Sequence, residues 1–158
     1  MIDANLRTLK IHDELGYTMK TGMCSRCGHN DLCHSQSDEV QTCAAYMPVL
    51  AFQSLAGCEL SFNTVRLGSA WSKRVTPGKT VALVNKAGEK LAEAVVEAVR
   101  VGPRTQMIAE HAAANHLMVA RKAQKPNAEL TRVLRNLYGP NFLARAETMS
   151  VIYLRIIE

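Results

Sequence analysis

Between positions 47 and 102 the chain is a series of short apolar runs separated by turn residues, and this pattern limits the fold more than any other feature. Short runs rich in β-branched and apolar residues, bounded by Pro, Gly or Asn, are typical of strands. Pro77 and Gly78 supply one turn, and the KAGE segment at 86–89 supplies another. The pattern predicts strands at 47–52, 62–67 and 80–85.

The next segment, KLAEAVVEAVRV at 90–101, is compatible with two structures. Its apolar residues recur at helical spacing, which favours an amphipathic helix. The turn before it, its valines, and Gly102 and Pro103 after it favour a strand. We predict a strand.

Helices are expected at 105–119, which is rich in alanine, and at 127–138. Asn127 is the predicted N-cap of the second helix, and Gly139 is its predicted stop. The last segment, MSVIYLRII, is β-branched and aromatic, which predicts a closing strand. A length of 158 residues suits one main domain with a small appendage. We therefore predict an α+β protein with an N-terminal segment at 1–45 and a main domain at 46–158.

The formal net charge of +5 is unevenly distributed. Residues 1–60 carry four Lys and Arg against seven Asp and Glu, a net charge of −3, whereas residues 61–158 carry fifteen against seven, a net charge of +8. The basic part is a candidate for contact with phosphates, although a solvated basic surface without a partner also accounts for it. No apolar run approaches the roughly 18 to 20 residues of a membrane span, and no signal peptide is visible, so we expect a cytoplasmic protein.

Four of the five cysteines cluster in CSRCGHNDLCHSQSDEVQTC, a segment with few apolar residues to bury. In a chain without a secretory signal such clustering favours a metal over disulfides. We predict a structural Zn²⁺ site, with His29 and His34 as competing ligands and an iron–sulfur cluster, a disulfide pair or unrelated thiols as alternatives. Cys58 is predicted to be a buried structural thiol. The predicted zinc ligands are Cys24, Cys27, Cys33 and Cys43.

The segment FNTVRLGSAWSKRVTPGKTVALVNKAGE resembles the ASCH domains of the PUA-like superfamily. In that family a strand with a Thr-x-Arg element leads to a Pro-Gly turn and then to a strand of the type "vaLv". Thr64 and Arg66 form the element here, and 80–85 is the second strand. The resemblance covers about 47–157. It implies a partly open β-barrel with flanking helices and a cleft that holds RNA or a modified nucleoside.

Some relatives in this family are amidohydrolases that remove the acetyl group of acetylcytidine with a lysine, a threonine and a glutamate. The resemblance places Ser61, Thr64 and Asn115 at these positions, so only the threonine is retained. Serine and asparagine cannot replace lysine and glutamate in proton transfer near neutral pH. We expect the pocket to remain while amide hydrolysis by this route is lost.

The strand at 62–67 carries several hydrogen-bonding side chains. Alternation along a strand places Thr64 and Arg66 on one face, and Asn63 on the other unless the strand bulges. On the predicted helix, His111 and Asn115 are four residues apart and so point into the same cleft. Thr64 and Arg66 could instead satisfy neighbouring groups within the fold, and Asn115 could be a helix C-cap.

Trp71 is the only tryptophan and lies beside Lys73 and Arg74. A base stacked on an aromatic ring next to cations is common in single-strand recognition, whereas a core anchor is the alternative role. The predicted nucleotide-binding residues are Asn63, Thr64, Arg66, Trp71, Lys73, Arg74, His111, Asn115 and His116.

We therefore expect RNA or nucleotide binding through a cleft bounded by Thr64, Arg66 and the 105–119 helix. One alternative is a hydrolase acting on an acylated nucleoside, with His111 as base near Thr64 or Ser61. Another is a protein-interaction module of phage origin whose partner contacts the N-terminal segment.

Overall fold

The computed structural model describes residues 47–145 and 147–157. The predicted zinc ligands Cys24, Cys27, Cys33 and Cys43 and the predicted domain boundary at residue 45 lie outside the described residues. The described chain divides into two compact units, one of 47–54 with Thr80–Ala94 and one of Leu55–Lys79 with Val95–Ile157.

The first unit contains two strands that pair in parallel, β1 (Val49–Ala51) and β3 (Thr80–Val84), with Leu50 opposite Leu83. Both strands were predicted, and both consist largely of buried apolar residues, as parallel strands do. The buried side chains of this unit include Met47, Val49, Ala82 and Val84, which form one cluster.

The second unit contains an antiparallel pair, β2 (Ser61–Leu67) and β5 (Thr148–Ile156). β4 (Lys90–Pro103) begins in the first unit and continues into the second, so the strand interpretation of 90–101 is confirmed. Ala94 and Val96 are buried on this strand while Glu97 is exposed, because strand geometry and not helical spacing decides which side chains face the core.

Hydrogen bonding orders the strands β1-β3-β4-β5-β2, with β1 and β2 at the two edges of a mixed sheet. Five helical segments of the second unit follow β4 along the chain: α3 (Arg104–His111), the 3₁₀ turn η2 (Ala112–Ala114), α4 (His116–Ala120), α5 (Pro126–Tyr138) and α6 (Phe142–Arg145). The structure thus confirms the predicted α+β class, a mixed five-stranded sheet with flanking helices. Among the described helices, none is long and apolar enough to cross a membrane.

The prediction of one continuous helix at 105–119 was wrong. Asn115 is extended, with φ −67° and ψ 134°, and its side-chain oxygen accepts a hydrogen bond from the Leu117 N–H, so it is the N-cap of α4. The suggestion that Asn115 is a C-cap is therefore also wrong. An asparagine caps a helix start well because it replaces a missing acceptor for the first N–H groups.

The second predicted helix exists, but α5 begins at Pro126 and Asn127 is not its N-cap. Proline is tolerated in the first turn because that turn lacks intrahelical partners for its N–H groups. The Glu129 carboxylate accepts a hydrogen bond of 2.9 Å from the Lys125 N–H just before the helix. Gly139, with φ 82°, ends the helix as predicted.

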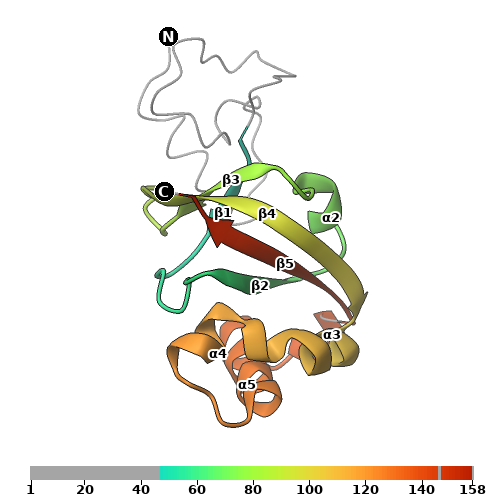
Figure 1. The fold of residues 1–158 in the computed structure, drawn as a ribbon. Coiled ribbons are helices and arrows are strands. Elements are labelled where there is room, and N and C mark those ends of the chain that lie inside the picture. The colour runs from blue at the N-terminus through green and yellow to red at the C-terminus, as the bar shows by residue number, and fades with distance from the viewer. Residues whose placement is uncertain (1–46, 146, 158) are drawn as a thin grey trace. The chain divides into compact units, whose positions relative to one another are not determined.

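The helices α3, α4 and α5 gather on one side of β2 (Figure 1). Their apolar faces join one face of β2 and β5 in a single core, which also includes the short helix α6 (Phe142–Arg145). The buried members of this core include Val65, Met107, Ile108, Ala112, Met118, Leu130, Leu134, Phe142, Met149 and Val151. This core fixes the helical segments against β2, the strand that carries most of the candidate site.

Candidate functional site

The two faces of β2 divide the predicted site residues into two groups. The register between β2 and β5 is unbroken from Ser61 opposite Arg155 to Leu67 opposite Met149, so β2 has no bulge and its side chains alternate. The Asn63 amide donates a hydrogen bond of 2.9 Å to the His111 carbonyl on the helical side.

The even-numbered residues of β2 lie on the other face. The Phe62 ring meets the His116 ring edge to face, with 6.3 Å between centroids. Thr64 and Arg66 follow Phe62 on this face, as alternation predicted. The structure therefore groups Thr64 and Arg66 with His116, and it groups Asn63 with His111 and Asn115.

On the helical side, Asn63 and Asn115 are buried, with 0% and 1% of their surface exposed. The Asn115 amide lies 3.5 Å from the Asn63 carbonyl oxygen and 3.4 Å from the Asn63 side-chain oxygen, and the two residues form an isolated parallel bridge. The amides are therefore engaged in holding the break between η2 and α4 against β2.

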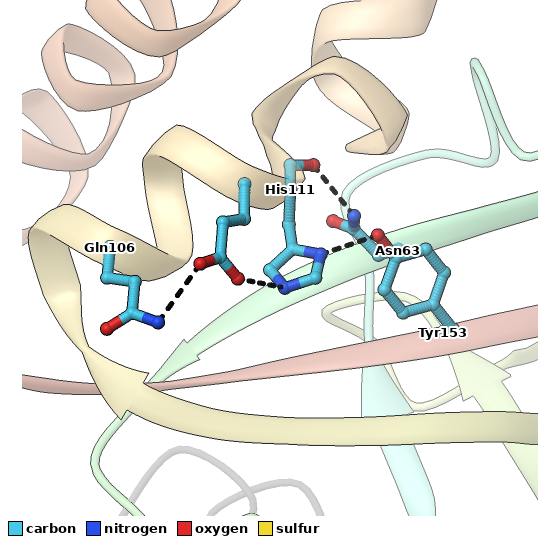
Figure 2. Close-up of polar contacts among 5 residues, drawn as sticks. Asn63, Gln106, His111 and Tyr153 are labelled. Atoms are coloured by element: carbon cyan, nitrogen blue, oxygen red, sulfur yellow. Dashed lines mark hydrogen bonds and ion pairs between the residues drawn. The ribbon is translucent and has the colours of Figure 1, made fainter.

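His111 has a polar neighbour at each ring nitrogen (Figure 2). Its Nδ1 lies 2.7 Å from the Tyr153 hydroxyl, and its Nε2 lies 3.6 Å from a Glu110 carboxylate oxygen. The Gln106 amide donates a hydrogen bond of 3.0 Å to the other oxygen of Glu110. We call Asn63, His111, Asn115 and Tyr153, with Glu110 and Gln106, the Asn63 network.

The sequence interpretation missed Glu110 and Tyr153 as partners of His111. Glu110 precedes His111 directly in the sequence, so it could have been considered as a partner of the imidazole. Tyr153 gave no local signal, because it reaches His111 only through the strand pairing that sets it opposite Asn63.

On the other face, two arginines lie close to the Trp71 ring. The Arg66 guanidinium is 5.5 Å and the Arg74 guanidinium 4.9 Å from the centroid of the Trp71 ring. Trp71 and Arg74 belong to α2 (Trp71–Arg74), a single turn that the sequence interpretation did not predict, and Lys73 on this turn is exposed. We call Arg66, Trp71, Lys73 and Arg74 the Trp71 cluster.

His116 contacts Phe62 on this face of β2 and is 7% exposed. Its pKa is lowered from 6.5 to about 4, mainly by burial; a hydrogen bond with the Ala56 backbone opposes the shift, and the positive charge of Arg66 adds to it. The imidazole is therefore neutral near pH 7. The positive charge of this region comes from the Trp71 cluster and not from His116.

The hydroxyls considered for a hydrolase lie elsewhere. Thr64 is buried on the face of β2 opposite to His111. The Ser61 hydroxyl is exposed and donates a hydrogen bond to Glu97, whose carboxylate also lies 3.5 Å from the Arg155 guanidinium. The imidazole of His111 is instead in contact with Tyr153, so the hydrolase alternative stays a prediction without support from these contacts.

Within the described part of the chain, no group of three or more His, Cys, Asp or Glu side chains is arranged to hold a metal ion. The zinc prediction rests on cysteines outside that part and stays a prediction.

Cys58 is buried, and burial raises the pKa of its thiol from 9.0 to about 11. At pH 8 only about 0.1% of such a thiol is thiolate, the reactive form. We expect Cys58 to escape alkylation by iodoacetamide at pH 8 in the native protein and to react fully in guanidinium chloride, as measured by peptide mass mapping. Rapid alkylation of native Cys58 would contradict the structural role assigned to it.

No family model matches the chain, and no curated protein matches it. Solved structures with a similar fold include the hypothetical protein PH0355, with 17% identity, a TM-score of 0.48, and coverage of 69% of this chain and 97% of that one. They also include protein PF0455 from Pyrococcus furiosus, with 18% identity, a TM-score of 0.39, and coverage of 61% and 81%.

An ASCH domain from Lactobacillus crispatus is similar as well, with 11% identity and a TM-score of 0.40. This similarity covers 63% of the present chain and 65% of the ASCH chain. At such identities the likeness concerns the fold, and no ligand or activity follows from it.

Proposed function

We propose that this protein binds RNA or a nucleotide through the Trp71 cluster. One observation carries the proposal: a partly exposed indole ring lies within 5.5 Å of the Arg66 guanidinium and 4.9 Å of the Arg74 guanidinium. Single-stranded nucleic acids are bound by aromatic rings that stack on bases, next to cations that contact phosphates. The resemblance of the sequence around Thr64 and Arg66 to ASCH domains supports the same ligand class.

The Trp71 cluster is a smaller set of residues than the predicted nucleotide-binding cleft. Lys73 and Arg74 are exposed, and Arg66 and Trp71 are partly exposed, so all four side chains are accessible to a ligand. Asn63 and Asn115 are buried and bonded to each other, and they support the site from the opposite face of β2. Thr64 and His116 are buried on the same face as Arg66.

We expect Trp71→Ala to weaken binding of a single-stranded RNA oligonucleotide by about fivefold or more, since one base stacked on an aromatic ring contributes about 1–3 kcal/mol. The measurement is fluorescence anisotropy of a labelled oligonucleotide at low salt. Because Trp71 is the only tryptophan in the chain, quenching of its own fluorescence reports ligand contact directly in the unaltered protein.

Two matched variants separate stacking from fold and charge. Trp71→Phe keeps an aromatic face and should retain most of the affinity, whereas Arg121→Gln removes an exposed charge outside the cluster and should change it little. The affinity should also fall with salt, because bound phosphates release counterions. Unquenched Trp71 fluorescence in the presence of saturating RNA would defeat the proposal.

A further inference from the structure

A groove with a volume of about 630 Å³ lies between α3 and α5, on residues that the proposed function does not use. Its volume is within the range of about 300–1,000 Å³ that is usual for small-molecule sites. The polar side chains that line it and bear on its chemistry are Arg104 and Thr105 from α3 and Asn127, Arg132, Arg135 and Asn136 from α5.

The lining follows from helical geometry. The α5 residues in the groove form adjacent pairs that repeat every four positions between Asn127 and Asn136, which defines one stripe along a helix. Leu130 and Leu134, between them in sequence, face the core and are buried. Because Leu130 and Leu134 pack in the core, the stripe of α5 that carries Arg132 and Arg135 faces the groove beside α3.

The groove is strongly basic. Three of its described lining residues are arginines and none is acidic. Among the described residues, no hydrogen bond or ion pair joins the side chain of Arg132 or Arg135 to another residue, and both are exposed. Glu129, the nearest acid on α5, bonds instead to the Lys125 N–H. The two guanidinium groups keep their donors available.

Arg104 is held in place by the core. Its guanidinium lies 5.5 Å from the centroid of the Phe142 ring, which is 1% exposed and stacks on Tyr138. The Arg104 Nε is buried and has no hydrogen-bond partner among the described residues. A buried donor without a partner is costly, so Arg104 has hydrogen-bonding capacity that the described residues do not use.

We propose that the groove between α3 and α5 binds phosphate groups. A guanidinium pairs with two oxygens of a phosphate at once, and three such groups around one groove match a ligand with more than one negative charge. The amides of Asn127 and Asn136 and the Thr105 hydroxyl add neutral donors. The ligand is either a small phosphorylated molecule or the backbone of a nucleic acid, because both present the same chemistry.

The test uses the full chain and inorganic pyrophosphate, titrated by calorimetry at low ionic strength. We expect saturable binding by the unaltered protein and a loss of about tenfold or more in R132Q/R135Q, because each charge-assisted hydrogen bond contributes strongly. The matched control is R100Q/R121Q, which removes two exposed charges outside the groove. Its affinity should change by less than about threefold, since exposed charges at a distance are screened.

Arg135→Lys keeps the charge and loses the planar fork, and it should still weaken binding several-fold. Circular dichroism of each variant confirms the fold, which is expected to persist because Arg132 and Arg135 are exposed. Equal losses in the two double variants, or no saturable binding of pyrophosphate, would overturn the proposal.

A titration with single-stranded RNA distinguishes the two sources of phosphate. If the groove holds a nucleic acid backbone, R132Q/R135Q should reduce the slope of log affinity against log salt by about 1.4, since each phosphate contact contributes about 0.7. If the ligand is a small molecule, this variant loses pyrophosphate and keeps the RNA slope. Trp71→Ala should leave pyrophosphate binding intact, so failure of the proposed RNA site and failure of this groove are separable.

Discussion

Gly57→Ala is expected to lower the free energy of unfolding by more than about 4 kcal/mol, or to prevent folding. A Cβ atom at this position would lie 1.9 Å from the His116 carbonyl oxygen and 2.9 Å from the Ala120 backbone nitrogen. Both obstacles are backbone atoms of α4, so no side-chain rotation relieves the clash. The φ angle of +77° adds strain for any residue with a Cβ.

Gly68→Ala is the matched control. Gly68 has a similar φ of +83°, but a Cβ there would have no heavy atom within 4 Å. The free energy of unfolding of this variant should fall only by the cost of a positive φ for a residue with a Cβ, about 1–2 kcal/mol. Chemical denaturation of both variants measures the difference. Equal losses would mean that α4 does not pack against Gly57 as described.

Acid is expected to destabilise the protein through His116. The unfolded imidazole takes up a proton near pH 6.5, whereas the folded one does so only near pH 4. The unfolded state therefore binds more protons in this range, and the free energy of unfolding falls as pH decreases from 6.5 to 4. The shift corresponds to a total loss of about 3 kcal/mol, complete below the folded pKa.

Urea denaturation between pH 7 and pH 4 measures this dependence in the native protein and in His116→Gln. Carboxylates titrate at the acidic end of the same range in both proteins, so the difference between the two curves isolates His116. The variant should be less stable at pH 7 because it loses the contact with Phe62, and its curve should be flatter between pH 6.5 and 5. Parallel curves would contradict neutral burial of this histidine.

Most strands of the described units could be predicted, because turn residues and β-branched runs are local signals. The segment 90–101 shows the limit of periodicity, since its apolar spacing fits a helix while its neighbours make it β4. The flanking Gly102 and Pro103 gave the better evidence. Helix ends were less predictable. The sequence favoured Asn127 as the N-cap of α5, whereas the helix begins at Pro126 and Lys125 is the N-cap.

The candidate site was predicted by residue type but not by arrangement. Alternation placed Thr64 and Arg66 on one face of β2, and the structure agrees. The separation of His111 from His116 was not predictable, because it depends on the break at Asn115, which a tertiary contact with Asn63 stabilises. The arginines of α5 were visible in the sequence, but only the packing of α3 against α5 turns them into a groove.

The break at Asn115 also covers part of an outer edge of the sheet. β2 is the last strand of its sheet, and such an outer edge offers unpaired backbone groups on which a strand of another molecule can add. Asn115 forms a bridge with Asn63 at the middle of this edge, and its amide approaches the Asn63 carbonyl oxygen. The segment at Asn115 occupies this part of the edge, so fewer backbone groups of β2 are available for pairing with a strand of another molecule.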